Sequence, residues 1–295
     1  MRILLTGAGG FSGAHVLARL LGGGHRVTAV AGRRSLGRLS DTLLGNPKLT
    51  VLQGDLAGDL ALPDQLDAVV HAAATSPASG IGTADFVRDN VVATLRLAKH
   101  ARRAGVKKFI YFSSLSVFGR ITTPSVDDLT PITDPDPYGA TKLVGEQILA
   151  DEATHFSTIA LRLPGVIGPL SVRNWLSTVL TKAQAGEAIE LYNPGARFNN
   201  AVYIDDLAAF VITLLGNDWH GFDVLTLGAA GESTIAEIVG AIVAGTGGRS
   251  MLRVLDVERP AFIISSRKAI DRYGYRPLSI DDMVARFIRA GDQSP

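Results

Sequence analysis

Tyr138 and Lys142 are the residues whose types and spacing most directly suggest chemistry in this sequence. They stand four positions apart, so a helix over residues 138–154 would place both on one face. An ammonium group beside a phenol favours the phenolate, and we therefore expect the pKa of Tyr138 to fall from about 10 toward neutrality. A phenol tuned in this way can exchange a proton with a sugar or alcohol oxygen while a hydride moves at the adjoining carbon.

A glycine-rich segment, residues 6–13, follows a predicted first strand and opens a predicted helix. In this setting Gly7 permits a tight turn, Gly10 lets a pyrophosphate approach the backbone, and Gly13 lets the helix pack on the sheet. The helix N-terminus adds free N–H groups and the positive end of the helix dipole. The segment, with Phe11 and Ser12 included, therefore predicts a dinucleotide-binding site.

The end of the second predicted strand, residues 26–31, bears on which dinucleotide binds. A site for NAD usually has Asp or Glu there to accept the ribose 2′-hydroxyl. This chain instead has Gly32, Arg33 and Arg34 after Ala31. A guanidinium can bind a 2′-phosphate through two hydrogen bonds, whereas exposed loop arginines would give the same pattern. We expect NADP(H) to be favoured, with Arg33 as the residue concerned, and NAD(H) to stay possible.

Strands alternate with helices through the first half of the chain, which indicates right-handed βαβ units and a parallel sheet. The predicted strands are residues 3–6, 26–31, 49–53, 68–73, 108–113 and 157–163, and the longer predicted helices are residues 85–104, 138–154 and 172–185. We expect a dinucleotide-binding domain over residues 1–169. A smaller domain over residues 170–295 would mainly bind the substrate, with residues 201–228 returning to the sheet.

Composition excludes several classes of function. The chain is 46% hydrophobic but only 6% aromatic, which is typical of parallel sheets buried on both faces. The net charge is +1 and no long basic run occurs, which argues against nucleic acid as a partner. No Cys is present, so disulfides and thiolate metal sites are excluded, and no metal is expected. With no signal peptide apparent and no apolar run of about 18 residues, we expect a cytoplasmic protein without a membrane span.

Further motifs complete a recognisable set. They are Gly54-Asp55-Leu56, His71-Ala72-Ala73-Ala74, Asn90 with Thr94, Ser113 to Gly119, Pro137 to Lys142 with Glu146, and Leu161 to Pro164. On these residues the chain resembles the extended short-chain dehydrogenase/reductase superfamily, in particular its nucleotide-sugar epimerase/dehydratase group. The resemblance implies an α/β fold with a Rossmann-type doubly wound parallel sheet and a smaller, interleaved C-terminal substrate domain. It also implies a homodimer formed through the helices near residues 85–104 and 138–154.

The resemblance implies a role for each matching residue. Tyr138 would be the acid/base and would also contact the cofactor, Lys142 would hold the nicotinamide ribose, and Ser114 would hydrogen-bond the reacting oxygen. Asn90 would shape the active-site end of its helix. The remaining cofactor contacts implied in this way are Asp55, Leu56, Ala72, Ala73, Leu163, Pro164 and Val166.

The expected substrate is a nucleotide sugar, with Ser76, Asn174, Arg197 and Asn199 as candidate binding residues. The UDP-galactose 4-epimerases place an Arg on the substrate diphosphate where this chain has Asn199, and Arg197 stands two residues earlier. Either Arg197 takes over that role or the substrate is not a standard nucleotide diphosphate-sugar.

Departures from the family pattern narrow the reaction. The 4,6-dehydratases carry an acidic pair where this chain has Leu115 and Ser116, which argues against dehydration. Three hypotheses remain: an NADP(H)-dependent reductase or dehydrogenase of a sugar carbon, a 4-epimerase with tightly held NAD, and a non-catalytic sensor or assembly protein. The presence of Tyr138 argues against the third.

Overall fold

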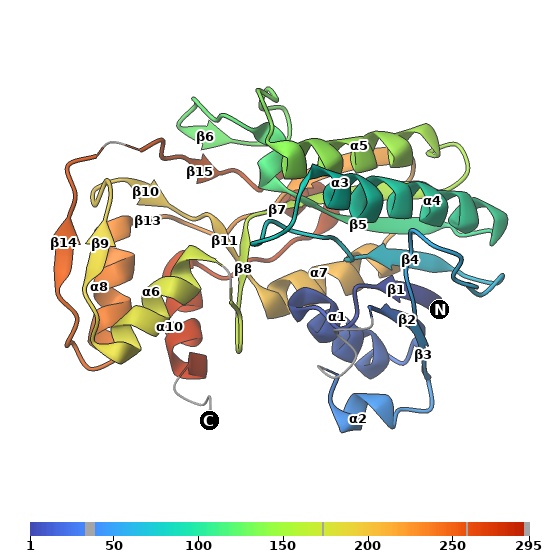
Figure 1. Ribbon diagram of the computed structural model, residues 1–295, viewed down its shortest axis with the longest axis horizontal. Coiled ribbons are helices and arrows are strands. Elements are labelled where there is room, and N and C mark those ends of the chain that lie inside the picture. Colours follow the sequence, from blue (N-terminus) through green and yellow to red (C-terminus); the bar gives the residue numbers. More distant parts are fainter. Residues whose placement is uncertain (33–38, 173, 258, 292–295) are drawn as a thin grey trace. The chain divides into compact units, whose positions relative to one another are not determined.

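The computed structural model describes residues 1–32, 39–172, 174–257 and 259–291 of the chain (Figure 1). These residues form two compact units. The first unit comprises residues 1–120, 131–162 and 208–225, and the second comprises residues 121–130, 163–207 and 226–295. The predicted assignment of cofactor and substrate binding to residues 1–169 and 170–295 stays a prediction.

A seven-stranded sheet forms the centre of the first unit, in the order β12-β7-β5-β4-β1-β2-β3. Its strands are β1 (Arg2–Thr6), β2 (Arg26–Ala31), β3 (Leu49–Gln53), β4 (Ala68–His71), β5 (Lys108–Ser114), β7 (Ser157–Leu163) and β12 (Phe222–Thr226). β1 pairs in parallel with β2 and β4, β2 with β3, and β4 with β5. The predicted α/β class and parallel sheet are confirmed, and β12 adds one strand at an edge.

Helices cover both faces of this sheet. α1 (Phe11–Gly22) lies on one face, and α4 (Ala93–Arg103) and α5 (Pro137–Asp151) lie side by side on the other (Figure 1). The central strands are mostly apolar because both faces are covered; Ile3, Leu4 and Leu5 of β1, for example, are fully buried. The remaining helices of this unit are the short α2 (Asp41–Leu44) and α3 (Thr83–Phe86) and most of α7 (Ile204–Gly216).

The helix predicted over residues 85–104 differs in detail. A π-helical turn, Val87–Val92, separates α3 from α4. Such a turn shifts the hydrogen bonding from i+4 to i+5 and is frequent at functional sites. Here the Thr94 hydroxyl donates to the Asn90 carbonyl oxygen at 2.5 Å, so a side chain bonds a backbone oxygen inside the irregular turn.

Two glycines allow α5 to approach the sheet closely. The buried positions of α5 include Lys142, Gly145, Glu146 and Leu149, which recur every three or four residues and so lie on one face. Gly145 packs on the buried ring of Tyr111, and a Cβ at Gly139 would overlap the carbonyl oxygen of Ser116. Ser116 lies in the 3₁₀ turn Leu115–Phe118 that follows β5.

The second unit contains the helices α6 (Trp175–Ala185), α8 (Ile235–Gly245), α9 (Arg267–Tyr273) and α10 (Ile280–Gly291). Its short strand pairs are β6 (Ser125–Val126) with β15 (Ile263–Ile264), β8 (Gly165–Ile167) with β11 (Ala201–Tyr203), β9 (Ile189–Leu191) with β14 (Leu252–Val254), and β10 (Arg197–Phe198) with β13 (Ser233–Thr234). The helix predicted from residue 172 begins at Trp175, because Asn174 caps it by accepting from Ser177 N–H at 2.8 Å. No helix in the described part of the chain is long and apolar enough to cross a bilayer.

We predict that Gly139→Ala destabilises the protein by about 1–3 kcal/mol, because the added methyl group must displace the backbone at Ser116. Gly240→Ala is the matched control. Gly240 lies inside α8 with no atom within 4 Å of the position that an added methyl group would take, so this change should stabilise by about 0.5–1 kcal/mol. Urea denaturation checks both, and equal effects of the two substitutions would contradict the close packing of α5.

Candidate functional site

The glycine-rich segment forms a tight turn between β1 and α1. Gly7 has a φ of +74°, and a Cβ there would lie 2.6 Å from the backbone nitrogen of Ala73. A Cβ on Gly13 would overlap the carbonyl oxygen of Gly7. α1 begins with Gly10 as its N-cap residue and has neither a capping side chain nor an acidic residue in its first turn. The turn thus leaves the N–H groups and positive dipole end of α1 for an anion.

A cavity of about 840 Å³ lies in the first unit against this turn. Of the residues predicted to bind a cofactor, it is lined by Gly7, Gly10, Asp55, Leu56, Ala72 and Ala73. Phe11, Ser12 and Gly13 form the first turn of α1. Leu163, Pro164 and Val166 belong to the second unit, where Val166 lies in β8. Arg33 lies outside the described residues, so its predicted role toward NADP(H) stays a prediction.

A buried chain of hydrogen bonds runs from the end of β1 to the π-helical turn. Ala73 N–H donates to Thr6 Oγ1 at 3.3 Å, and Thr6 Oγ1 lies 2.6 Å from His71 Nδ1. His71 Nε2 lies 3.0 Å from Thr94 Oγ1, which itself donates to Asn90. Because Thr94 uses its proton on the carbonyl oxygen of Asn90, His71 must carry its proton on Nε2 and accept from Thr6 on Nδ1.

His71 is therefore a structural residue. Burial first, and the charge of Lys142 second, lower its pKa to about 3. The imidazole is neutral at physiological pH and both of its nitrogens are used inside the protein.

The Asn90 side chain links this chain to two further segments. Its Oδ1 accepts from Thr75 N–H at 2.8 Å, and its Nδ2 donates to the carbonyl oxygen of Thr75 at 3.0 Å and to Thr141 Oγ1 at 3.2 Å. The Thr141 hydroxyl donates in turn to the carbonyl oxygen of Tyr138 at 2.8 Å. Asn90 thus ties the segment after β4 to the N-terminal part of α5, and its role in shaping the active site stays a prediction.

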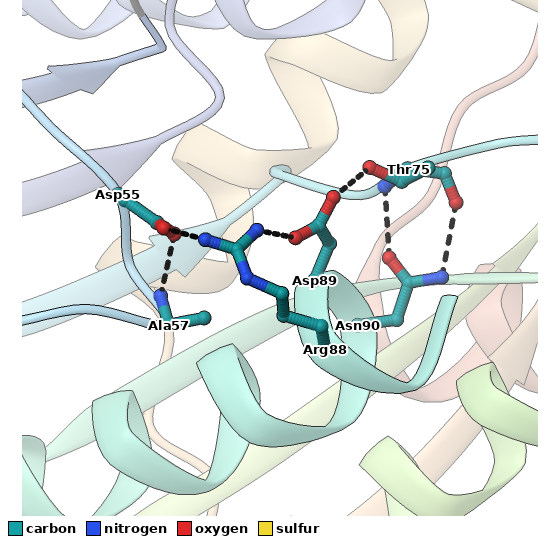
Figure 2. A network of polar contacts seen from close by, with 6 residues as sticks. All are labelled: Asp55, Ala57, Thr75, Arg88, Asp89 and Asn90. Atoms are coloured by element: carbon teal, nitrogen blue, oxygen red, sulfur yellow. Dashed lines mark hydrogen bonds and ion pairs between the residues drawn. The ribbon is translucent and has the colours of Figure 1, made fainter. Parts of the chain in front are cut away.

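Figure 2 shows a second network beside Asn90 that sequence reasoning missed. Thr75 Oγ1 donates to Asp89 at 2.6 Å, Arg88 donates to Asp89 at 2.6 Å, and Arg88 also forms an ion pair with Asp55. Thr75, Arg88 and Asp89 line the same cavity as Asp55. The sequence alone could not predict this network, because adjacent Arg and Asp residues are common on exposed helices that line no cavity.

The predicted catalytic residues meet where β5 ends and α5 begins. Ser114 is the last residue of β5, and its Oγ accepts from Ser116 N–H at 3.1 Å. The Ser114 side chain lies close enough to the phenol of Tyr138 to lower the pKa of that phenol. Tyr138 follows Pro137 in the first turn of α5, where Asp136 caps the helix by accepting from Gly139 N–H at 2.6 Å. The edge of the Phe86 ring packs against Tyr138, with ring centroids 5.8 Å apart.

The predicted lowering of the Tyr138 pKa is wrong for the protein without ligands. Burial raises the pKa of Tyr138, the hydrogen bond from Ser114 lowers it in part, and the charge of Asp136 raises it further. Spacing of four residues along α5 places Lys142 one turn away, but burial of the phenol is the largest effect on its pKa.

Lys142 is itself buried and lies over an aromatic ring. Its Nζ is 4.1 Å from the ring centroid of Tyr111, and the residue is 1% exposed. Burial lowers the pKa of Lys142 to about 7, while the charge of Glu146 acts in the opposite direction. A perturbed pKa of this kind is typical of functional sites.

Glu146 holds α5 on two strands of the sheet. Arg162 of β7 binds it through two hydrogen bonds, Nε to Oε1 at 3.1 Å and an NH2 nitrogen to Oε2 at 2.8 Å. Ser113 of β5 donates to Oε1 at 2.5 Å, and the Arg162 guanidinium carbon lies 4.7 Å from the ring centroid of Phe118. Glu146 and Arg162 are 1% and 5% exposed, so the ion pair is shielded from solvent.

The second unit has a cavity of its own, of about 380 Å³. Its lining includes the aromatic residues Trp175 and Phe198, whose rings are 5.1 Å apart, together with Arg197. It also includes Tyr192 and Arg259, whose guanidinium carbon lies 3.7 Å from the ring centroid of Tyr192. Flat rings beside guanidinium groups suit a ligand with an aromatic base and phosphates.

The four predicted substrate residues fall into different settings. Arg197 lines the cavity of the second unit and forms an ion pair with Glu232 at 3.7 Å, whereas Asn174 caps α6. Ser76 is exposed on the first unit.

Asn199 differs from its predicted role. Its Nδ2 donates to the carbonyl oxygens of Ala229 and Ile264 at 3.2 and 2.8 Å, and its Oδ1 accepts from Ile264 N–H at 2.7 Å. Both N–H donors are used by the backbone and the residue is 4% exposed, so Asn199 holds loops of the second unit together. No group of three or more metal-binding side chains gathers within the described residues.

Comparison with known proteins gives a consistent result. Residues 3–225 match the model of the NAD dependent epimerase/dehydratase family. A UDP-glucose 4-epimerase from Erwinia amylovora is 30% identical over 285 residues, which cover 84% of each chain. The solved structure of MoeE5 in complex with UDP-glucuronic acid and NAD covers 100% of both chains at 27% identity, with a TM-score of 0.81. That of UDP-glucuronic acid 4-epimerase from Bacillus cereus in complex with NAD covers 99% of both at 22% identity, with a TM-score of 0.85, and so shows the fold.

We predict that Lys142→Met stabilises the protein without ligands, and does so more at pH 6 than at pH 9. The folded-state pKa of Lys142, about 7, lies below the value of 10.5 for an unperturbed lysine. The cost of burying the charge is therefore fully present below pH 7 and disappears as the pH rises toward 10.5. Urea midpoints at several pH values measure this, with the exposed Lys99→Met as the control. A stabilisation that does not depend on pH would contradict the buried charge.

Proposed function

The chain belongs to the NAD dependent epimerase/dehydratase family, and on that premise we propose that it is a nucleotide-sugar 4-epimerase. It would oxidise an alcohol carbon of the sugar with bound NAD(H) and then return the hydride to the keto sugar. The observation that carries this proposal is that Ser114, at the end of β5, acts on the phenol of Tyr138 at the start of α5, with the buried Lys142 one turn further along that helix. The relative from Erwinia amylovora, a UDP-glucose 4-epimerase by name, supports the choice of reaction.

The first unit offers a site that fits a dinucleotide. The cavity of about 840 Å³ adjoins Gly7 and Gly10, where a Cβ would clash with the backbone of Ala73 and crowd the carbonyl oxygen of Gly7. The cofactor, when bound, would accept a hydride from the sugar carbon and give one back. The N–H groups of α1 would hold the pyrophosphate, Asp55 would accept from the adenine amino group, and Lys142 would bind the nicotinamide ribose.

Tyr138 and Ser114 would handle the proton. As the C–H bond of the sugar breaks with its electron pair, the O–H bond breaks too, and its proton passes to the phenolate oxygen of Tyr138. The Ser114 hydroxyl would hydrogen-bond the same sugar oxygen and fix its position. Tyr138 must be ionised for this step, and its burial opposes that form. A positive charge beside the phenol would favour the phenolate, and Lys142, one turn along α5, would supply it.

The residues after Ser114 support epimerisation over dehydration. Dehydration needs a carboxyl pair that removes a proton and protonates the departing hydroxide. Leu115 and Ser116 occupy those positions, and Ser116 N–H bonds the Ser114 hydroxyl instead.

The cavity of the second unit is the proposed site for the substrate nucleotide. Trp175 and Phe198 would form an apolar wall for the base, and Arg197 and Arg259 would face the phosphates. Arg197 would thus take over the role that an arginine two positions later has in the UDP-galactose 4-epimerases.

An NADP(H)-dependent reductase of a keto sugar is the second candidate. The observation in its favour is the end of β2, where Ala31 and Gly32 stand in place of a carboxylate for the ribose 2′-hydroxyl. NAD in the solved neighbours favours the epimerase. The two candidates share Tyr138 and differ in whether the hydride returns to the same sugar.

We predict that Tyr138→Phe lowers kcat for the interconversion of UDP-glucose and UDP-galactose by roughly 10²–10⁴-fold, because the proton acceptor is lost. The ring that packs on Phe86 is kept, so affinity for NAD and the thermal midpoint should stay within error. Tyr203→Phe, in β11 of the second unit, is the matched control. Unchanged turnover in Tyr138→Phe would refute the mechanism, and a wild-type protein that binds NAD without any turnover of nucleotide sugars would favour the non-catalytic hypothesis.

A further inference from the structure

Arg88 joins two carboxylates on the wall of the cavity in the first unit (Figure 2). One guanidinium nitrogen donates to Asp89 Oδ1 at 2.6 Å, and another is paired with Asp55 Oδ2. The second oxygen of Asp55 accepts from Ala57 N–H at 2.9 Å. All three charged side chains line the cavity, so the guanidinium lies where a ligand of that cavity would meet it.

The order of the strands identifies the end of the cavity that Arg88 occupies. Asp55 follows β3 at one edge of the sheet, the glycine turn follows β1, and Ser114 ends β5 two strands further on. A dinucleotide with its pyrophosphate on the glycine turn and its nicotinamide toward Ser114 and Tyr138 must extend its adenosine toward β3. Arg88 and Asp55 therefore stand at the adenosine end.

Stability of the fold does not account for this network. The side chains of Arg88, Asp55 and Asp89 are 57%, 47% and 31% exposed. Ion pairs with that exposure are well solvated and contribute little to folding. The same pairs would be desolvated by a bound ligand, and their attraction would then strengthen.

Arg88 also reduces the negative charge of the cavity wall. The lining includes the carboxylates of Asp55, Asp85 and Asp89, and these would repel the pyrophosphate of a dinucleotide. The guanidinium of Arg88 lies between two of them and offsets their charge. Without it, the wall next to the cofactor would become more negative.

Asp89 links Arg88 to the segment after β4, because it accepts hydrogen bonds from both Arg88 and Thr75. Thr75 Oγ1 donates to the second oxygen of Asp89 at 2.6 Å, and the backbone of Thr75 is held by Asn90. That segment includes Ala73, which lies against Gly7 in the phosphate turn. Arg88 thus binds Asp55 directly and holds the segment at Thr75 in place through Asp89.

We propose that Arg88 is a cofactor-positioning residue that sets affinity for the adenosine half of the dinucleotide, by orienting the Asp55 carboxylate and offsetting the negative charge of the cavity wall. The proposal rests on the cofactor site described under the proposed function. It concerns binding and makes no use of the identity of the sugar.

Calorimetric titration of the full chain with NAD⁺, ADP-ribose and nicotinamide mononucleotide tests the proposal. Arg88→Met should weaken binding of NAD⁺ and of ADP-ribose alike, by about tenfold, the size of effect expected for one charge-assisted hydrogen bond. Binding of nicotinamide mononucleotide, which has a phosphate but no adenosine, should fall clearly less than that of ADP-ribose. Arg88→Lys keeps the charge without the planar fork, and should recover part of the affinity.

Arg96→Met is the matched control. Arg96 lies on the same helical stretch, two turns after Arg88, and pairs with Asp59 in an ion pair that is still more open to solvent. It should bind all three ligands as the wild type does. The loss in Arg88→Met should also shrink between about 50 and 500 mM salt, because repulsion from the remaining carboxylates is screened.

Three results would overturn the proposal. Arg88→Met with wild-type affinity for NAD⁺ and ADP-ribose would do so while leaving the proposed function intact. An equal loss for nicotinamide mononucleotide would show that the effect is not confined to the adenosine end. A wild-type protein that binds neither NAD⁺ nor ADP-ribose would overturn the cofactor site and the role of Arg88 together. Equal thermal midpoints of both methionine variants and the wild type confirm that folding is not the cause.

Discussion

The buried ion pair between Glu146 and Arg162 is the interaction on which the arrangement of the site depends. It joins the middle of α5 to β7, and Ser113 of β5 donates to the same carboxylate. Removing one partner of such a pair leaves an uncompensated buried charge, which costs about 3–5 kcal/mol. The pair therefore fixes the position of α5 strongly, and with it Lys142 one turn before Glu146 and Tyr138 two turns before. Gly139 and Gly145 remove the side chains that would otherwise hold the helix away from Ser116 and Tyr111.

With α5 fixed, buried polar groups connect the cofactor cavity to the proposed catalytic residues. Ala73 is linked through Thr6, His71 and Thr94 to Asn90, and Asn90 through Thr141 to Tyr138. Each group in this chain has a donor or an acceptor to match, which is what buried polar side chains require. Asn90 lies in the π-helical turn, and its buried side chain hydrogen-bonds both Thr75 and Thr141. Lys142 lowers the stability of the fold, because burial disfavours its charged form. Residues that function requires often reduce stability in this way.

Local sequence patterns were sufficient for the framework of the first unit. Six of its seven strands were predicted from mainly apolar segments that alternate with helices. Gly7 is required by a positive φ and Gly13 by close packing, and their spacing predicts both. Pairings between distant segments were not predictable in this way. Arg88 and Asp55 are 33 positions apart and exposed, and Asn199 is polar but fully used by backbone 30 and 65 positions away. The pKa of Tyr138 was predicted with the wrong sign because spacing along a helix shows a neighbouring charge and not the extent of burial.

The proposed reaction makes one claim that a single labelling measurement tests directly, namely that the hydride leaves a sugar carbon and returns to that carbon. The wild-type protein would be incubated with UDP-glucose carrying deuterium at C4, together with excess unlabelled NADH and NADPH in solution. We expect UDP-galactose that retains the deuterium at C4, with none in the free nicotinamide pool, because the hydride never leaves the site. Deuterium in free NADH or NADPH, or a product whose C4 hydrogen comes from the solution cofactor, would contradict it and favour the reductase.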